Sequence, residues 1–115
     1  MNHKTRLIEE QFNLIKTKNK TIEVRLNDKK RQQFNLGDEL EITNRQNSEE
    51  KIKVKLIGKS HFQNFNQLYS NFPNEKFGLT KETSIKEKLE LVSQFYSKEQ
   101  EKELGVVGLH LELID

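Results

Sequence analysis

The sequence predicts one α+β domain over residues 1–115, a small mixed or antiparallel β-barrel with helices covering one opening. Alternating apolar and polar residues at 21–26, 39–43 and 51–56 predict strands. Turn-forming residues separate these segments, which favours a sheet that curls into a barrel. Apolar residues with a helical repeat predict the covering helices, and 115 residues is the size of one domain.

The amino-acid composition excludes several kinds of functional site. The 20 basic and 18 acidic side chains leave a net charge of +2, so any nucleic-acid binding must come from a local patch. The absence of cysteine excludes disulfides, thiolate catalysis and cysteine zinc sites. Because no apolar run reaches the length of a membrane helix or a signal peptide, we expect a cytoplasmic protein with no membrane partner. The many Lys, Asn and Glu residues suggest a bacterial source.

The first third of the chain begins with residues 3–8, whose pattern fits either a short strand or the start of a helix. A short helix follows from Glu9 to near Thr17, with acidic residues at its start and lysines at its end, as the helix dipole favours. Lys18-Asn19 predicts a turn, because asparagine tolerates the left-handed conformation. Strand 21–26 comes next.

A polar, mostly basic loop is predicted at 27–31, with Phe34 and Leu36 anchoring its far end to the core. Gly37-Asp38 then turns the chain into strand 39–43, and 44–50 reads as a hairpin loop. In strand 51–56 the outward lysines would face the glutamates of 39–43 across an antiparallel pair, which favours that register.

The second half is mainly helical. Residues 65–72 predict a helix that Pro73 ends. Ser84-x-x-Glu87 is a capping box for a helix that would bury Ile85, Leu89, Val92 and Phe95 on one face, and Ser97-x-x-Gln100 repeats the signal for a short helix. Residues 106–114 then predict a central strand that closes the sheet.

The candidate site is the polar side of strand 21–26. Apolar residues alternate with Thr21, Glu23 and Arg25 there, and Lys20 stands at the start of the strand. A strand has a side-chain period of two, so one side can enter a core while the other presents these groups together. Two interpretations remain open: a solvated face with a weak surface ion pair, or a functional row that lines a cleft.

Lys20-Thr21-Ile22-Glu23-x-Arg25, a charged loop, and Leu36-Gly37-Asp38 before a strand resemble the signature of ASCH (activating signal cointegrator homology) domains, members of the PUA-like superfamily of small barrels. The resemblance extends to the closing segment that begins at Gly105. One departure is the turn, where Lys18 and Asn19 stand in place of the usual glycine. The resemblance implies a PUA-like barrel, a strand at 3–8, and a charged row that lines the cleft between barrel and helices.

For function, the resemblance implies an RNA- or nucleotide-binding domain. Lys20 and Arg25 would contact phosphate and Glu23 would accept a hydrogen bond from the exocyclic amine of a base. An enzyme is the alternative, in which Lys20 and Glu23 are catalytic in a ribonuclease or a modified-nucleoside amidohydrolase. One similar bacterial branch hydrolyses N4-acetylcytidine with a lysine, a threonine and a glutamate; Lys20 matches its lysine, but Glu23 stands at its threonine.

Lysines and Arg31 flank the strand on both sides. They would form either an approach surface for a phosphate backbone or ordinary surface charge that keeps the protein soluble. The predicted ligand-binding residues are Lys18, Lys20, Thr21, Glu23, Arg25, Lys29, Arg31, His61 and Tyr96. The three histidines lack ligand spacing, so no metal and no cofactor is expected. A cleft for a small metabolite or a protein partner is a third possibility, and the oligomeric state stays open.

Overall fold

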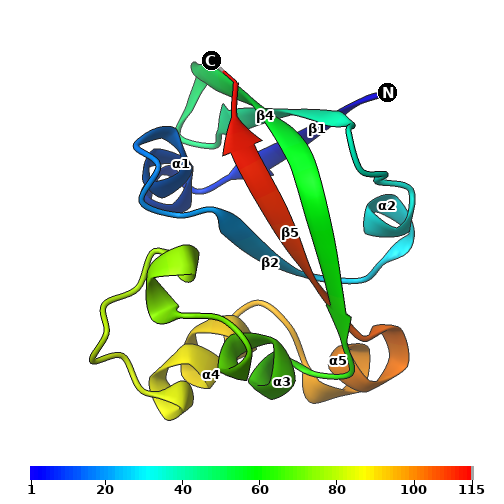
Figure 1. The fold of residues 1–115 in the computed structure, drawn as a ribbon, viewed down its shortest axis with the longest axis vertical. Helices are drawn as coiled ribbons and strands as arrows, with labels where there is room; N and C mark the ends of the chain where they lie inside the picture. The colour runs from blue at the N-terminus through cyan, green and yellow to red at the C-terminus, as the bar shows by residue number, and fades with distance from the viewer. Residues whose placement is uncertain (115) are drawn as a thin grey trace.

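In the computed structural model, which describes residues 1–114, a five-stranded sheet is combined with short helices (Figure 1). The strands are β1 (Asn2–Leu7), β2 (Ile22–Leu26), β3 (Glu39–Asn44), β4 (Asn47–Phe62) and β5 (Val106–Leu113). The helices are α1 (Glu9–Lys16), α2 (Lys29–Gln32), α3 (Phe65–Ser70), the 3-10 turn η1 (Asn74–Phe77), α4 (Ile85–Ser93) and α5 (Lys98–Leu104).

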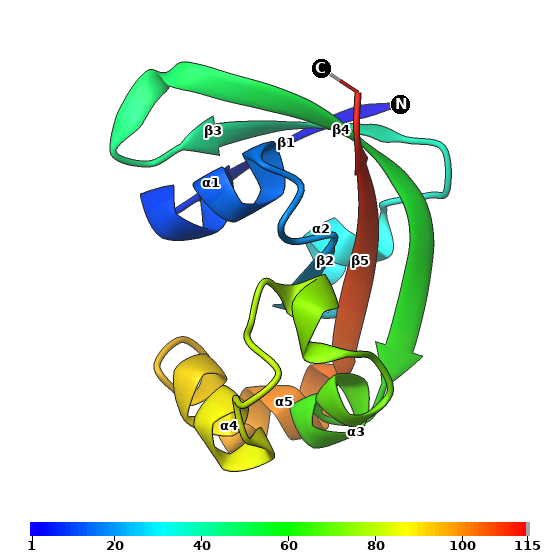
Figure 2. The same ribbon diagram turned by 60° about the vertical axis from the view of Figure 1, so that its left-hand side comes forward.

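The strand order in the sheet is β1-β3-β4-β5-β2. β1 runs parallel to β3 and every other neighbouring pair is antiparallel, so the sheet is mixed. The long strand β4 bends and carries the sheet into a half-barrel, while α3, α4 and α5 lie together at one end of it (Figure 2). The α+β class and the PUA-like architecture predicted from the sequence are therefore confirmed.

Two apolar cores hold the structure together. The first fills the inside of the half-barrel and includes Phe12, Phe34 and Val54, all of them essentially inaccessible. The second joins the outer side of the sheet to the helices through Ile22 and Leu68. Burial of aliphatic and aromatic side chains on this scale is the main stabilising term for both layers.

Both sides of β2 are buried, although the sequence predicted burial only of its apolar side. Its apolar residues Ile22 and Leu26 pack in the core beneath the helices. Its polar residues point the other way, and Glu23 pairs in register with Leu109, whose side chain belongs to the barrel core. The charged row therefore faces the interior of the half-barrel.

The connection from α1 to β2 places Lys20. The N–H of Lys18 donates to the carbonyl of Ile15 and the N–H of Asn19 donates to that of Leu14, the two bonds of a Schellman turn. Lys18 takes the left-handed conformation, with φ of 65°, so the sequence expectation that Asn19 would do so was wrong. The turn fixes the direction in which the chain enters β2.

The predicted register of the β3–β4 hairpin is confirmed, because Glu39 faces Lys55 and Glu41 faces Lys53. Two expected loops were wrong. The loop expected at 44–50 is a tight turn, since β4 already begins at Asn47. The loop expected at 27–31 contains α2, because the Asp28 side chain caps it.

Three residues expected in the core are exposed: Leu36 at 65%, Phe95 at 63% and Ile85 at 38%. Leu36 and Phe95 stand beside residues that are held more firmly by the core, Phe34 and Tyr96. Nowhere in residues 1–114 is there a helix with the length and apolar character needed to cross a membrane.

Candidate functional site

Glu23 is the centre of the candidate site. Its Oε1 accepts a hydrogen bond from Lys20 Nζ at 2.7 Å, and its Oε2 accepts one from Arg25 Nε at 2.8 Å. Lys20 and Glu23 are only 7% and 8% exposed, respectively. Glu23 and Arg25, which the sequence placed on one side of a strand, and Lys20, which it placed at the start of that strand, therefore converge, and they do so away from bulk water.

The neighbouring cations decide the charge of Glu23. Burial by itself would raise the pKa of this carboxyl, but the charges of Lys20 and Arg25, together with their hydrogen bonds, lower it to about 2. For Arg25 the two effects have opposite signs: burial would lower its pKa, but the charge of Glu23 and its hydrogen bond raise the pKa above the ordinary value. Glu23 is thus a carboxylate at neutral pH, able to accept hydrogen bonds.

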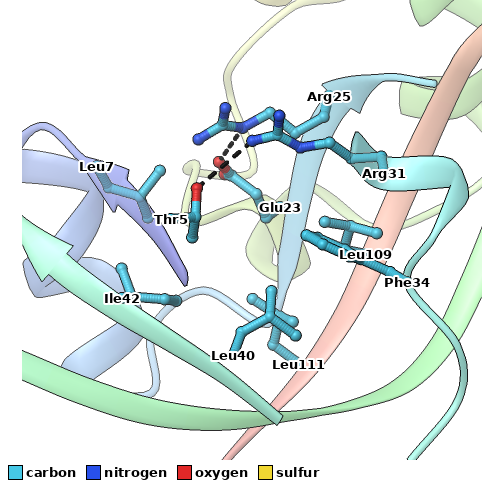
Figure 3. A pocket seen from close by; sticks show the side chains of 10 residues that line it. All are labelled: Thr5, Leu7, Glu23, Arg25, Arg31, Phe34, Leu40, Ile42, Leu109 and Leu111. Atoms are coloured by element: carbon cyan, nitrogen blue, oxygen red, sulfur yellow. Dashed lines mark hydrogen bonds and ion pairs between the residues drawn. The ribbon is translucent and has the colours of Figure 1, made fainter. Parts of the chain in front are cut away.

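Figure 3 shows Glu23 and Arg25 beside Arg31, which α2 brings to the same place from outside the predicted strand. Arg31 Nη1 donates to Asp28 Oδ2 at 3.3 Å and Arg31 Nη2 donates to Thr5 Oγ1 at 3.4 Å. Its Nε is buried and has no hydrogen-bond partner among residues 1–114. One donor of this guanidinium is therefore unsatisfied.

β1 and β2 are the two edges of the sheet, and side chains bridge the gap between them, which we call the seam. Arg25 Nη2 donates to the carbonyl of Arg6 at 3.4 Å, and Lys30 Nζ donates to that of Lys4 at 2.6 Å. Both carbonyls belong to β1, so cationic side chains from β2 and α2 take the place of a backbone ladder here.

The seam has an excess of positive charge. Four cations and two carboxylates lie close enough there for their charges to act on one another: Arg6, Arg25, Lys30, Arg31, Glu23 and Asp28. Lys20, paired with Glu23, adds a fifth cation. Burial lowers the pKa of Lys30, and the charges of Arg31 and Arg25 lower it further. Like charges held this close favour an anion that would relieve their repulsion.

Behind the seam lies a cavity of about 10 Å³, which is room for about one water molecule. Its lining combines charged groups at the mouth with apolar groups of the barrel core, as Figure 3 shows: Thr5, Leu7, Glu23, Arg25, Arg31, Phe34, Leu40, Ile42, Leu109 and Leu111. The barrel is filled, so a ligand larger than water would contact the charged groups from outside.

Tyr96 approaches the same cations from the helical layer. Its ring stacks on Phe65, with centroids 5.6 Å apart and planes at 18°. Burial raises the pKa of Tyr96, and it lies close enough to Arg25 and Arg31 for their charges to act on it. Phe95, next to it in sequence, is exposed. The structure thus places a fixed aromatic ring and an exposed one near the cationic seam.

The remaining predicted site residues are elsewhere. Lys18 and Thr21 line a separate groove along β5. Lys29 is exposed at the start of α2, and His61 is exposed on β4; neither side chain hydrogen-bonds within residues 1–114. Arg6 is a seam residue that sequence reasoning missed, because β1 offered only an ambiguous pattern.

Residues 1–114 contain no group of three or more His, Asp or Glu side chains arranged to hold a metal ion.

A family model described as ASCH domain matches residues 6–115. The crystal structure of hypothetical protein PH0355 is similar, with a TM-score of 0.85 and 33% identity over 99% of this chain and 100% of that one. A solution NMR structure of a protein from Pyrococcus furiosus has a TM-score of 0.74 and 30% identity, over 100% of this chain and 99% of that one.

An ASCH domain from Lactobacillus crispatus is similar in fold, with a TM-score of 0.70 at 17% identity, over 97% of this chain and 79% of that one. None of the curated proteins matches the chain.

Proposed function

The chain belongs to the ASCH domain family, and from that premise we propose that it binds RNA or a nucleotide through the charged seam around Glu23. The observation that carries the proposal is the concentration of Arg6, Arg25, Lys30 and Arg31 at one place in a chain whose net charge is only +2. Local positive charge of this kind supplies the phosphate-binding part of nucleic-acid affinity.

Arginine is suited to this role because its guanidinium presents several donors in a plane and matches two phosphate oxygens at once. Arg25 uses Nε on Glu23, while its Nη2 makes only a long contact of 3.4 Å with a backbone carbonyl. Arg31 has an unsatisfied Nε, but this atom is buried and faces the water-sized cavity. Arg25 is therefore the arginine that retains a donor for a ligand outside the barrel.

Glu23 orients these groups, and its contact with a base would require the side chains that cover it to move. Each of its oxygens already accepts one hydrogen bond, and a carboxylate oxygen has capacity for a second. A charged carboxylate can accept from the exocyclic amine of cytosine. Tyr96 and the exposed Phe95 would supply the stacking surfaces on which unpaired bases commonly rest.

A filter-binding titration of short single-stranded RNA tests the proposal. At low salt we expect Arg25→Ala and Lys30→Gln to weaken binding, and each lost phosphate contact to reduce the salt slope by about one. Lys102→Gln, an exposed lysine on α5, is the matched control and should bind as the wild type does. Absence of binding by the wild type, or equal weakening by the control, would reject the seam as the interface.

Catalysis by the same residues is the alternative, and the close contact of Lys20 Nζ with Glu23 Oε1 favours it. With its pKa lowered to about 2, Glu23 is a weak base at neutral pH, so in such a reaction it would hold and orient Lys20. Incubation of N4-acetylcytidine, and separately of labelled RNA, with wild type and Glu23→Gln tests this idea. Turnover by the wild type that the substitution abolishes would support it, and no turnover would remove it.

A further inference from the structure

A second hollow lies away from the Glu23 network. It has a volume of about 540 Å³ and borders the end of α1, the turn η1 and the part of β5 that extends past the start of β2. This volume falls within the range of small-molecule sites, roughly 300–1,000 Å³. We call it the β5 groove. Lys20 borders it too, but its ammonium group is engaged by Glu23 and Gln11.

Two lysines give the β5 groove its charge. Lys18 and Lys76 line it from opposite elements, and neither forms an ion pair within residues 1–114. Glu112 is the single carboxylate among the lining residues. Glu23 neutralises the charge of Lys20. The two remaining lysines outweigh the one carboxylate, so the net charge of the groove is positive and complements an anion of one or two charges.

Lys18 occupies its position at a conformational cost. A left-handed backbone at a residue other than glycine costs about 1–2 kcal/mol, and φ at Lys18 is 65°. Strained residues persist where the surrounding structure holds them, and they concentrate at ligand sites. Here the strained residue places a cation at the rim of a groove.

Apolar side chains form the walls of the β5 groove. Ile57 is 53% exposed at the point where the β4–β5 register shifts, so the irregularity turns this side chain outward. Phe72 and Leu113 are half-buried and line the same space. An exposed isoleucine beside an aromatic ring gives a surface on which a planar ring can pack.

His110 supplies a polar group of fixed direction. Its Nε2 lies 2.8 Å from Ser60 Oγ, and its ring meets Phe72 edge-on at 5.2 Å. Burial lowers the pKa of His110, and the nearby charge of Lys76 lowers it further. The neutral imidazole keeps one ring nitrogen free of Ser60 to bond a ligand.

We propose that the β5 groove binds a small organic phosphate of mononucleotide size, with its phosphate between Lys18 and Lys76 and its ring against Ile57 and Phe72. This site is independent of the seam: RNA binding at the seam and ligand binding in the groove use different side chains and can fail separately.

The test is an NMR titration of the ¹⁵N-labelled protein with AMP, adenosine and inorganic phosphate as separate probes. We expect AMP to shift the amide resonances of Thr21, Lys76 and His110, and adenosine and phosphate to do so more weakly. Lys76→Gln should weaken AMP binding by at least about threefold, as the loss of one exposed charge contact implies. Glu112→Gln should strengthen it.

Lys86→Gln, an exposed lysine on α4, is the matched control and should leave AMP binding unchanged. Lys18→Asn should weaken binding while keeping a residue that tolerates the left-handed turn. Shifts confined to Arg25 and Arg31 would overturn the groove proposal and support the seam. Absence of shifts with AMP, or equal weakening by Lys86→Gln, would also overturn it.

Discussion

At the scale of single residues, Glu23 shows how burial and charge compete. Its carboxylate has lost most of its contact with water, yet Lys20 and Arg25 keep it ionised. The alternation of residues in 21–26 predicted that Glu23 and Arg25 share one side of a strand, with Lys20 at its start. It did not place Arg31, which the sequence suggested only as part of a flanking basic cluster, because the short helix α2 carries that side chain back to β2.

Removal of the Glu23 charge should destabilise the protein. Glu23→Gln leaves two cations without their carboxylate, and loss of one partner of a buried ion pair costs about 3–5 kcal/mol. The midpoint of urea unfolding should fall accordingly. Glu41→Gln is the control, since its contact with Lys51 is exposed and 3.9 Å long. Equal effects of the two substitutions would contradict a buried role for Glu23.

At position 18, glycine should give a more stable protein than alanine. Because φ is 65° there, Lys18→Gly should be more stable than Lys18→Ala by about 1 kcal/mol. At Asn13, an exposed position within α1, the order should reverse, since glycine weakens a helix interior. Thermal unfolding of the four variants measures both differences. The same order at both positions would mean that the turn is not strained.

At the scale of elements, β2 and β5 form the structural centre of the molecule. β5 lies between β4 and β2, supplies Val107 and Leu109 to the barrel core, and presents Gly108 to the helices. α3 can approach the sheet closely there because that position has no side chain. A Cβ on Gly108 would stand 3.0 Å from Leu68 Cδ1 and 3.2 Å from Ile22 Cγ2.

Gly108→Ala should therefore push α3 off the sheet and destabilise the protein by about 1–3 kcal/mol. The size of the effect should depend on Leu68. In a Leu68→Ala background the nearest contact is gone, so the added methyl group should cost less. A double-mutant cycle followed by urea unfolding measures this coupling. Additive effects would show that the close packing of α3 on β5 does not limit the substitution.

The elements also show what sequence patterns can reveal. Strands β2, β3, β5 and the first part of β4, with the β3–β4 register, followed from local periodicity, and both capping boxes followed from the spacing of their residues; the structure confirms them. Strand β1 did not follow from periodicity, because the pattern at 3–8 also fitted the start of a helix. The continuation of β4 to Phe62 did not, because the irregularity near Gly58 breaks the alternation. The polar side of β2 was expected at a cleft. Its packing inside the half-barrel depends on partners distant in sequence, which periodicity does not report.

At the scale of the whole molecule, ionised carboxylates tie the ends of the sheet together. Asp38, at the start of β3, accepts from the Met1 amino group at 3.3 Å and contacts His3 Nε2 at 2.8 Å, which secures β1. The backbone N–H of Asn35 and the His3 ring lower the pKa of Asp38 to about 2. Glu23 holds the opposite edge with a pKa that is also about 2.

Acid should therefore unfold the protein in a defined pH window. Carboxyls with lowered pKa values stabilise the fold fully above their ordinary values of 4.5 and 3.8, and the contribution is lost as the pH falls towards 2. The urea midpoint should be constant down to about pH 5 and fall steeply below it. Asp38→Asn should be less stable at neutral pH and should lose less on acidification. A midpoint independent of pH between 5 and 2 would contradict this account.

The pairing of β2 with β5 also has a consequence for synthesis. During translation, residues 27–105 must be added after β2 before the first residue of its sole partner strand exists. Until then Glu23 and Arg25 belong to a strand that has no partner strand on the growing polypeptide, and closing so long a loop is slow. A ribosome-bound chain halted before Val106 should leave the site incomplete, whereas synthesis past Leu113 should let it assemble.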